Sequence, residues 1–164
     1  MLESNFVKIF ENFPPEVATF LIAMLPIAEL RGAIPIALTV YQLEVWPAYV
    51  LAVIGNIIPA IFIVHLLGPV SGYLMQRFKI FNKFFTWLFA RTKHKFTGKY
   101  EKWGNLALMI FVAIPLPITG AWTGAVAAFL FGIPKSKSLI FIGLGAAIAG
   151  IIVSLMTLGI ISIF

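Results

Sequence analysis

The sequence predicts an all-α integral membrane protein that is built as an inverted repeat. Each half is expected to hold a re-entrant helical hairpin and a spanning helix, with amphipathic helices at the membrane interface. Hydrophobic residues make up 61% of the 164 residues and charged residues only 11%, whereas about 25% of a soluble domain is charged. Proline and glycine also interrupt two of the long apolar runs, and most basic residues lie in two segments.

The composition limits the chemistry that the chain can perform. It contains no cysteine and no aspartate, and its two histidines, His65 and His94, stand apart. Thiolate sites and disulfides are excluded, and no nucleophile–base set or phosphate-binding glycine loop is present. We therefore expect no enzymatic activity, no metal and no cofactor. In a chain this apolar, the net charge of +6 indicates contact with anionic lipid headgroups rather than with nucleic acid.

The chain is expected to form a single membrane domain with four parts. They are an interfacial segment, the first half of the repeat, a basic amphipathic linker and the second half, at residues 1–16, 17–76, 77–103 and 104–164. In the first part, the apolar residues recur at nearly helical spacing with charged residues between them, as in a helix that lies in the membrane interface. It lacks the basic start of a cleaved signal peptide, so we expect it in the mature protein.

The first half of the repeat opens with a broken apolar run. Pro26 and Pro35 flank the sequence Glu-Leu-Arg-Gly at 29–32, and proline interrupts helical hydrogen bonding. The apolar pieces on either side are each too short for a bilayer about 30 Å thick, so they are expected to form a hairpin that turns at 29–32. A spanning helix from Trp46 to Leu67 should follow, with a kink at Pro59.

The linker at 77–103 combines basic and aromatic side chains, and eight of the twelve basic residues lie in it. Spacings of three and four residues place its aromatic side chains on one helical face, as in basic helices at the headgroup level. It is interpreted either as a site that captures anionic lipid or as a plain membrane anchor. Just before it, Gly68–Pro69 either ends the spanning helix or, with Gly72, marks a close helix contact.

The second half repeats this order at a shift of about 88 residues. Its broken run, AIPLPITGAWTGA, occupies 113–125, and a short loop, PKSKS, follows at 134–138. A spanning helix from Leu139 to Phe164 ends the chain, and its small residues are suited to packing against a second copy in a homodimer. The alignment pairs glycine with glycine, namely Gly32 with Gly120 and Gly55 with Gly143.

Charge placement predicts the topology. If both hairpins return to the side from which they enter, the linker and the 134–138 loop share one side with ten of the twelve basic residues. The positive-inside rule makes that side cytoplasmic, in a multi-pass protein of the cell membrane. The two halves are then inverted relative to each other. Inverted repeats with interrupted helices that meet near the midplane are the architecture of secondary transporters.

The interrupted segments supply the candidate site. Charged groups at membrane depth are costly, so Glu29 is expected to couple transport to protons and Arg31 to hold an anionic group. A purely structural ion pair at the break is the alternative. Asn56 is expected either to complete the site or to bond a neighbouring backbone carbonyl. The other candidates for substrate binding surround the two breaks: Gly32, Pro35, Pro115, Pro117, Thr119, Gly120, Trp122, Thr123 and Gly124.

Backbone geometry decides whether these residues act together. Positions i and i+2 of a regular helix diverge, so Glu29 and Arg31 converge only if the backbone between them is irregular. Half-helices that begin beyond Gly32 and Gly120 would direct the positive ends of their dipoles at an anion. Hydroxyl groups and an aromatic wall at the second break would complete such a site.

Two sequences carry a resemblance to a known family. They are E-L-R-G-A-I-P at 29–35 and P-L-P-I-T-G-A-W-T-G-A at 115–125. With them the chain resembles the small multi-drug export protein family over nearly its whole length. That family is similar to a branch of the DedA/VTT (SNARE-associated) membrane protein superfamily. The resemblance implies two re-entrant hairpins and the movement or scrambling of lipids, including undecaprenyl phosphate.

The second hairpin of DedA proteins carries a Phe-Arg-Pro-Arg pattern, which this chain matches in part. Phe111 and Pro115 match its phenylalanine and proline, whereas Ala113 and Ile118 stand where the arginines would be. The resemblance therefore implies that Arg31, in the first hairpin, is the intramembrane charge left to hold a phosphate.

The favoured function is a membrane transporter or flippase, ion- or proton-coupled, for an anionic amphiphile or a lipid phosphate such as a polyprenyl phosphate. A small multidrug exporter of cationic compounds is the first alternative, although Arg31 would repel a cation bound at Glu29. A lipid scramblase or a non-transporting membrane scaffold is the second. The expected partners are membrane lipids, with anionic headgroups at 77–103.

Overall fold

The computed structural model describes residues 10, 12–103, 105–115 and 119–163, without the side chains of 95–102, 161 and 163. Over these residues the chain is helical and has no strand, which confirms the all-α part of the predicted fold class. The helices are α2 (Pro15–Met24), α3 (Glu29–Thr39), α4 (Val45–Arg77), α5 (Lys79–Trp103), α6 (Leu106–Ala113), α7 (Ala121–Leu130) and α8 (Lys135–Ile163).

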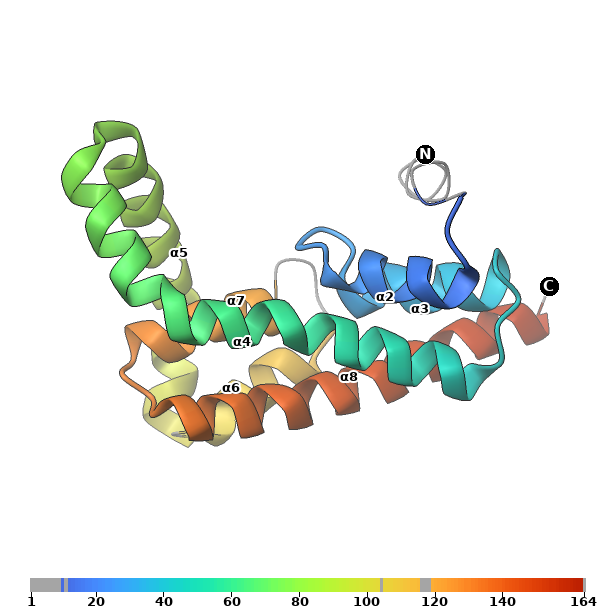
Figure 1. Ribbon diagram of the computed structural model, residues 1–164. Coiled ribbons are helices and arrows are strands. Elements are labelled where there is room, and N and C mark those ends of the chain that lie inside the picture. The colour runs from blue at the N-terminus through green and yellow to red at the C-terminus, as the bar shows by residue number, and fades with distance from the viewer. Residues whose placement is uncertain (1–9, 11, 104, 116–118, 164) are drawn as a thin grey trace. The chain divides into compact units, whose positions relative to one another are not determined.

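The described chain divides into two compact units. The first unit comprises the residues up to Ile58 and those from Ala146 onward, and the second comprises Pro59–Gly145. The first unit thus holds α2, α3, the start of α4 and the end of α8, and the second holds the rest of both long helices with α5, α6 and α7. Apart from α5, the order short helix, short helix, long helix occurs twice (Figure 1).

The first helix pair consists of α2 and α3, which run back along one another (Figure 1). Pro15 is the first residue of α2, a position where the missing N–H of proline would have no helical partner anyway. The break falls at Leu25, whose backbone is extended (φ −75°, ψ 135°). The cause is Pro26, because a residue that precedes proline avoids the helical region.

The predicted turn at 29–32 is therefore wrong. These four residues form the first turn of α3, and the chain reverses at 25–28 instead. Pro26 decides where the helix breaks, whereas glutamate, leucine and arginine are good helix formers that continue it. Pro35 lies inside α3 and does not end it.

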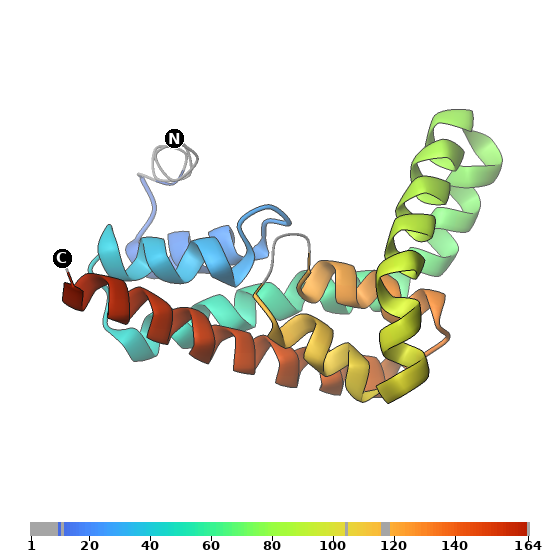
Figure 2. The same cartoon turned by 180° about the vertical axis from the view of Figure 1, so that it is seen from behind.

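The second helix pair consists of α6 and α7, which are in contact (Figure 2). α6 ends before Ile114, which is extended (φ −79°, ψ 115°) ahead of Pro115 by the same steric rule that ends α2. α7 begins after Gly120, whose φ of 142° and ψ of −168° belong to a region that is open essentially to glycine alone. Local steric rules thus break both helix pairs.

Each helix pair packs against a long helix through a glycine. A Cβ on Gly55 of α4 would lie 2.5 Å from the carbonyl oxygen of Phe20 in α2. A Cβ on Gly145 of α8 would lie 2.7 Å from the carbonyl oxygen of Met109 in α6. Glycine is required where helix backbones approach this closely. The alignment of Gly55 with Gly143 stays a prediction.

Two glycines of α8 lie against other helices of the same chain. Gly145 lies against α6, and a Cβ on Gly150 would lie 2.8 Å from the ring of Tyr49 in α4. The hydroxyl of Tyr49 also donates a hydrogen bond to the carbonyl of Ala147 over 3.1 Å. These two glycines pack within the chain, and a homodimer through the small residues of α8 stays a prediction.

Two helices, α4 and α8, are long and apolar enough to cross a membrane. In α4 and α8, only 33% and 39%, respectively, of an 18-residue apolar stretch is buried within the described structure. The core helix of a soluble protein would be mostly buried. α4 continues from Val45 to Arg77 and is longer than the predicted 46–67. The helix end at Gly68–Pro69 is wrong, because α4 bends in this stretch and continues (Figure 1).

The predicted loop at 134–138 is mostly the first turn of α8. The helix begins at Lys135, four residues before the predicted Leu139, and the N–H of Ser138 donates to the carbonyl of Pro134 over 2.9 Å. The basic linker is helical as predicted and forms α5. Residues 1–9 and 11 of the predicted interfacial segment lie outside the described residues.

Candidate functional site

Glu29 and Arg31 form an ion pair at the start of α3. The Nη2 atom of Arg31 donates a hydrogen bond to Oε2 of Glu29 over 3.3 Å. The side chain of Glu29 is 7% exposed and that of Arg31 is 22% exposed. A buried carboxylate is costly without a counter-charge, and the guanidinium of Arg31 supplies that charge.

The backbone of Glu29 makes the pair possible. Its φ of 48° lies in the left-handed region, which is uncommon for a residue other than glycine. Side chains two positions apart diverge on a regular helix, and here the irregular residue lets them meet, as expected. Strain of this kind costs about 1–3 kcal/mol and is concentrated at functional sites.

The start of α3 also acts on the carboxylate electrostatically. Glu29 is the first residue of the helix, where the positive end of the helix dipole favours a negative group. The expectation that this half-helix begins beyond Gly32 is therefore wrong. Gly32 lies in the first turn, where a Cβ would be 3.0 Å from the Cβ of Ala28. Pro35, one turn after Arg31, lacks the N–H that a helix would direct at the Arg31 carbonyl.

Asn56 lies in α4 with its amide group buried. The residue is 1% exposed, and neither Nδ2 nor Oδ1 has a hydrogen-bond partner among the described residues. The expected bond to a neighbouring backbone carbonyl is therefore wrong. A buried polar group that is left unsatisfied costs about 1–3 kcal/mol, so packing alone does not explain an asparagine here.

The hydroxyl groups of the second break bond to the backbone. Oγ1 of Thr119 donates to the carbonyl of Ile114 over 2.9 Å, across the break, and Oγ1 of Thr123 donates to the carbonyl of Gly120 over 3.4 Å. With their protons engaged, both oxygens can act toward a ligand only as acceptors. No described side chain caps the N-terminus of α7, and backbone N–H groups at a helix N-terminus can donate to an anion.

The remaining candidates of the second helix pair have different surroundings. Gly124 is buried, and a Cβ there would lie 2.6 Å from Cγ2 of Val112, so it serves the contact between α6 and α7. Trp122 is half-buried in the first turn of α7, and Pro115 is half-buried at the end of α6. Pro117 lies outside the described residues.

The structure brings together candidates within each unit. Glu29, Arg31, Gly32, Pro35 and Asn56 belong to the first unit, whereas the described candidates of the second helix pair belong to the second. Of the first set, Glu29 and Arg31 are in direct contact. The meeting of the two sets at a common site stays a prediction.

Two buried hydroxyl groups of the first unit were missed by sequence reasoning. The hydroxyl of Tyr41, which follows α3, and Oγ of Ser154, in α8, are buried without a hydrogen-bond partner among the described residues. Burial raises the pKa of the Tyr41 phenol above its ordinary value. No sequence signal identifies them, because the satisfaction of a hydroxyl group depends on its neighbours in space.

These features define a helical protein with two long apolar helices, two interrupted helix pairs and a buried ion pair at one interruption. A family model described as "Putative small multi-drug export protein" matches residues 29–152. The chain belongs to this family, and the match begins at Glu29 itself. No curated protein and no solved structure matches the chain.

Proposed function

We propose that the chain is a membrane transporter, or flippase, that moves an anionic amphiphile such as a lipid phosphate together with a proton. The observation that carries the proposal is the ion pair between the buried Glu29 and the partly buried Arg31 at the left-handed start of α3. Membership of the family supports a role in membrane export in general. The proposed activity involves no chemical reaction, metal or cofactor.

The ion pair offers a charge-neutral exchange of ligands. In the empty site, the carboxylate of Glu29 neutralises Arg31. An anionic headgroup that binds Arg31 displaces the carboxylate, which then takes up a proton because a buried carboxylate that loses its counter-charge is costly. With a monovalent headgroup, the formal charge of the site is zero before and after binding. Proton and anion therefore bind together and leave together.

The charges of the two units support the topology of the proposal. The sequence of the second unit has ten basic residues and one acidic residue, and that of the first unit has two basic and five acidic residues. Their net charges are +9 and −3, which together give the +6 of the chain. By the positive-inside rule, the linker 77–103 and the start of α8 lie on the cytoplasmic side of the cell membrane. Both helix pairs are then re-entrant, and the halves are inverted.

Export of cationic compounds is a second candidate, because the family carries a multi-drug description. In that case Glu29 binds the cation directly. The guanidinium of Arg31, 3.3 Å from the carboxylate, disfavours this by repulsion. The resemblance to the DedA/VTT superfamily favours a lipid phosphate. A scramblase or a scaffold needs no proton-binding group. The pH dependence of transport therefore separates these two functions, and cation export, from proton-coupled transport of an anion.

Transport in proteoliposomes tests the proposal. The full chain is reconstituted with a fluorescent lipid-phosphate analogue, and its movement between leaflets is followed under a pH difference across the membrane. We expect wild type to move the analogue faster when the side that holds it is acidic. Glu29→Gln should lose this pH dependence, because an amide takes up no proton. An unchanged pH response in Glu29→Gln would refute coupling through Glu29.

Controls separate the other functions. Glu44→Gln, in the exposed connection between α3 and α4, removes an equal charge and should keep the wild-type pH response. Movement of ethidium without movement of the analogue would favour cation export. Movement of neutral phospholipid at the same rate at every pH would indicate a scramblase, and no movement of any probe would indicate a scaffold. Each of these outcomes overturns the proposal.

A further inference from the structure

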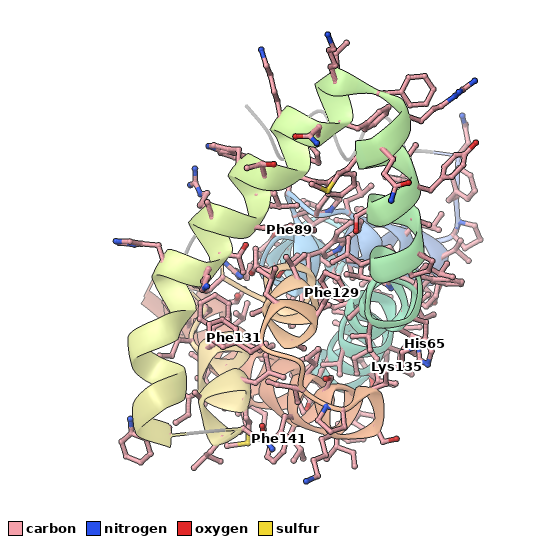
Figure 3. All side chains as sticks on the ribbon, turned by 90° about the vertical axis from the view of Figure 1, so that its left-hand side faces the viewer. His65, Phe89, Phe129, Phe131, Lys135 and Phe141 are labelled. Carbon is pink, nitrogen blue, oxygen red and sulfur yellow. The ribbon has the colours of Figure 1, made fainter. Side chains whose placement is uncertain are left out.

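One side of α5 is covered by the chain itself. α5 contacts both α6 and α7. Phe89 of α5 lies beside Phe129 of α7, with 5.8 Å between ring centroids (Figure 3). Phe85, one turn before Phe89, is 8% exposed, and Thr92 is 4% exposed. These positions share one helical face, which is the protein-facing side of α5.

A second apolar stripe follows the opposite side of α5. Ile80, Phe84 and Trp87 recur at helical spacing and are 81%, 50% and 55% exposed. Arg91 continues the stripe, with its guanidinium carbon 5.2 Å from the ring centroid of Trp87. An exposed row of large apolar side chains indicates a surface that meets lipid or another protein.

Basic side chains border this stripe. Lys79 and Lys83 are exposed and one helical turn apart, and Arg77 precedes them at the end of α4. Glu101 is the single acidic residue in the sequence of the second unit. Aromatic residues beside an excess of lysine and arginine are typical of helices that lie in the interface of an anionic membrane.

The course of α4 supports this position. Its 33 residues extend about 50 Å, whereas the hydrocarbon core is about 30 Å thick. The last turns of α4 therefore reach beyond the hydrocarbon if the helix spans. α4 bends in the stretch that contains Pro69, and its end leaves the earlier axis together with α5 (Figures 1 and 2). A helix that turns away at this level runs along the membrane surface.

We propose that α5 lies in the headgroup layer, with Ile80, Phe84 and Trp87 inserted among the acyl chains and Lys79 and Lys83 bound to anionic headgroups. The occupant of this surface is an anionic lipid leaflet. A second copy of the chain fits it less well, because two lysine borders would repel one another. The surface has this role whether or not Glu29 couples transport to protons.

Quenching by lipid tests the proposal. The chain has no cysteine, so Ala90→Cys, at an exposed position of α5 about two helical turns beyond Lys83, carries a single fluorescent label. The labelled full chain is reconstituted in brominated phosphatidylcholine, with and without phosphatidylglycerol. We expect stronger quenching with phosphatidylglycerol, and weaker quenching at high salt because salt screens the attraction. Each lysine near an anionic surface should shift the docking equilibrium roughly fivefold.

Charge reversal decides the outcome. Lys79→Glu with Lys83→Glu should abolish the effect of phosphatidylglycerol. Lys135→Glu with Lys137→Glu, the same charge change at exposed positions of α8, should leave it intact. If the reversed chain does not fold, Lys79→Ala with Lys83→Ala serves in its place. Equal quenching in the variant and in wild type would overturn the role of the lysines. Absence of quenching in every vesicle would show that the stripe meets protein instead.

Discussion

At Glu29, a left-handed backbone and a buried carboxylate coincide. Either feature alone has a structural explanation, since turns tolerate strain and ion pairs occur in protein interiors. Their coincidence at the first residue of the helix that follows the break at Pro26 is harder to explain by folding alone. Substitution of Arg31, the other residue of the pair, tests the structural contribution of the ion pair.

Arg31→Met should destabilise the chain because it removes the guanidinium that neutralises the buried carboxylate of Glu29. Breaking a buried pair costs about 3–5 kcal/mol, and the partial exposure of Arg31 should reduce this cost. The double variant Glu29→Gln with Arg31→Met should recover much of the loss. Thermal unfolding in detergent measures both. A double variant less stable than Arg31→Met would contradict the ion pair as described.

Asn56→Leu should raise stability and lower transport. Leucine has a similar volume and removes two unsatisfied polar atoms, which favours the variant by about 1–3 kcal/mol. If the amide serves the substrate, the lipid-phosphate analogue should move more slowly in the same vesicles. Unchanged transport in a stabilised variant would remove Asn56 from the site.

Gly120→Ala should destabilise the second helix pair. Its φ of 142° is strained for an L side chain, at a cost of about 1–3 kcal/mol, or roughly 2–12 °C in Tm. Gly72→Ala is the matched control, because nothing lies within 4 Å of a Cβ there. In the interior of α4, alanine should be neutral or stabilising. Equal Tm values for the two variants would contradict the backbone described at Gly120.

At the scale of elements, the sequence predicts which runs are broken but not where each turn falls. Leu25 and Ile114 are extended because proline follows, and this rule acts through neighbours in sequence. The assignment of the turn to 29–32 is wrong because Pro26 breaks the helix earlier, and residues 29–32 are helical. The unsatisfied amide of Asn56 could not be predicted, since it depends on side chains from other helices.

Gly55→Ala should separate α2 from α4. Its Cβ would lie 2.5 Å from a carbonyl oxygen of Phe20, so a helix must shift, and overpacking of this kind costs about 1–3 kcal/mol. Gly145→Ala should cost a similar amount at the equivalent contact in the second unit. Gly159→Ala, where a Cβ meets nothing within 4 Å, is the control. Melting temperatures in one detergent compare the three variants, and equal values would contradict the close contacts.

At the scale of the whole molecule, the two units differ in the sign of their net charge. The second unit is strongly basic and the first is acidic. The proposed topology places the basic segments of the second unit, 77–103 and the start of α8, on one side of the membrane.

Single cysteines test that topology, since the natural chain has none. Ser136→Cys, at the exposed start of α8, and Ala90→Cys, on α5, should react with a membrane-impermeant maleimide from the cytoplasmic side. Glu44→Cys should react from the opposite side. Labelling of Ser136→Cys and Ala90→Cys from different sides would show that one helix pair crosses fully.

The division of both long helices between the two units has a consequence for assembly. α4 begins in the first unit and ends in the second, and α8 does the reverse. Each half of the sequence therefore completes its hydrophobic core with a helix from the other half, which is the arrangement of a domain-swapped pair within one polypeptide. Two fragments cut at the loop after α5 should fold only when they are synthesised together, as an obligate heterodimer of halves.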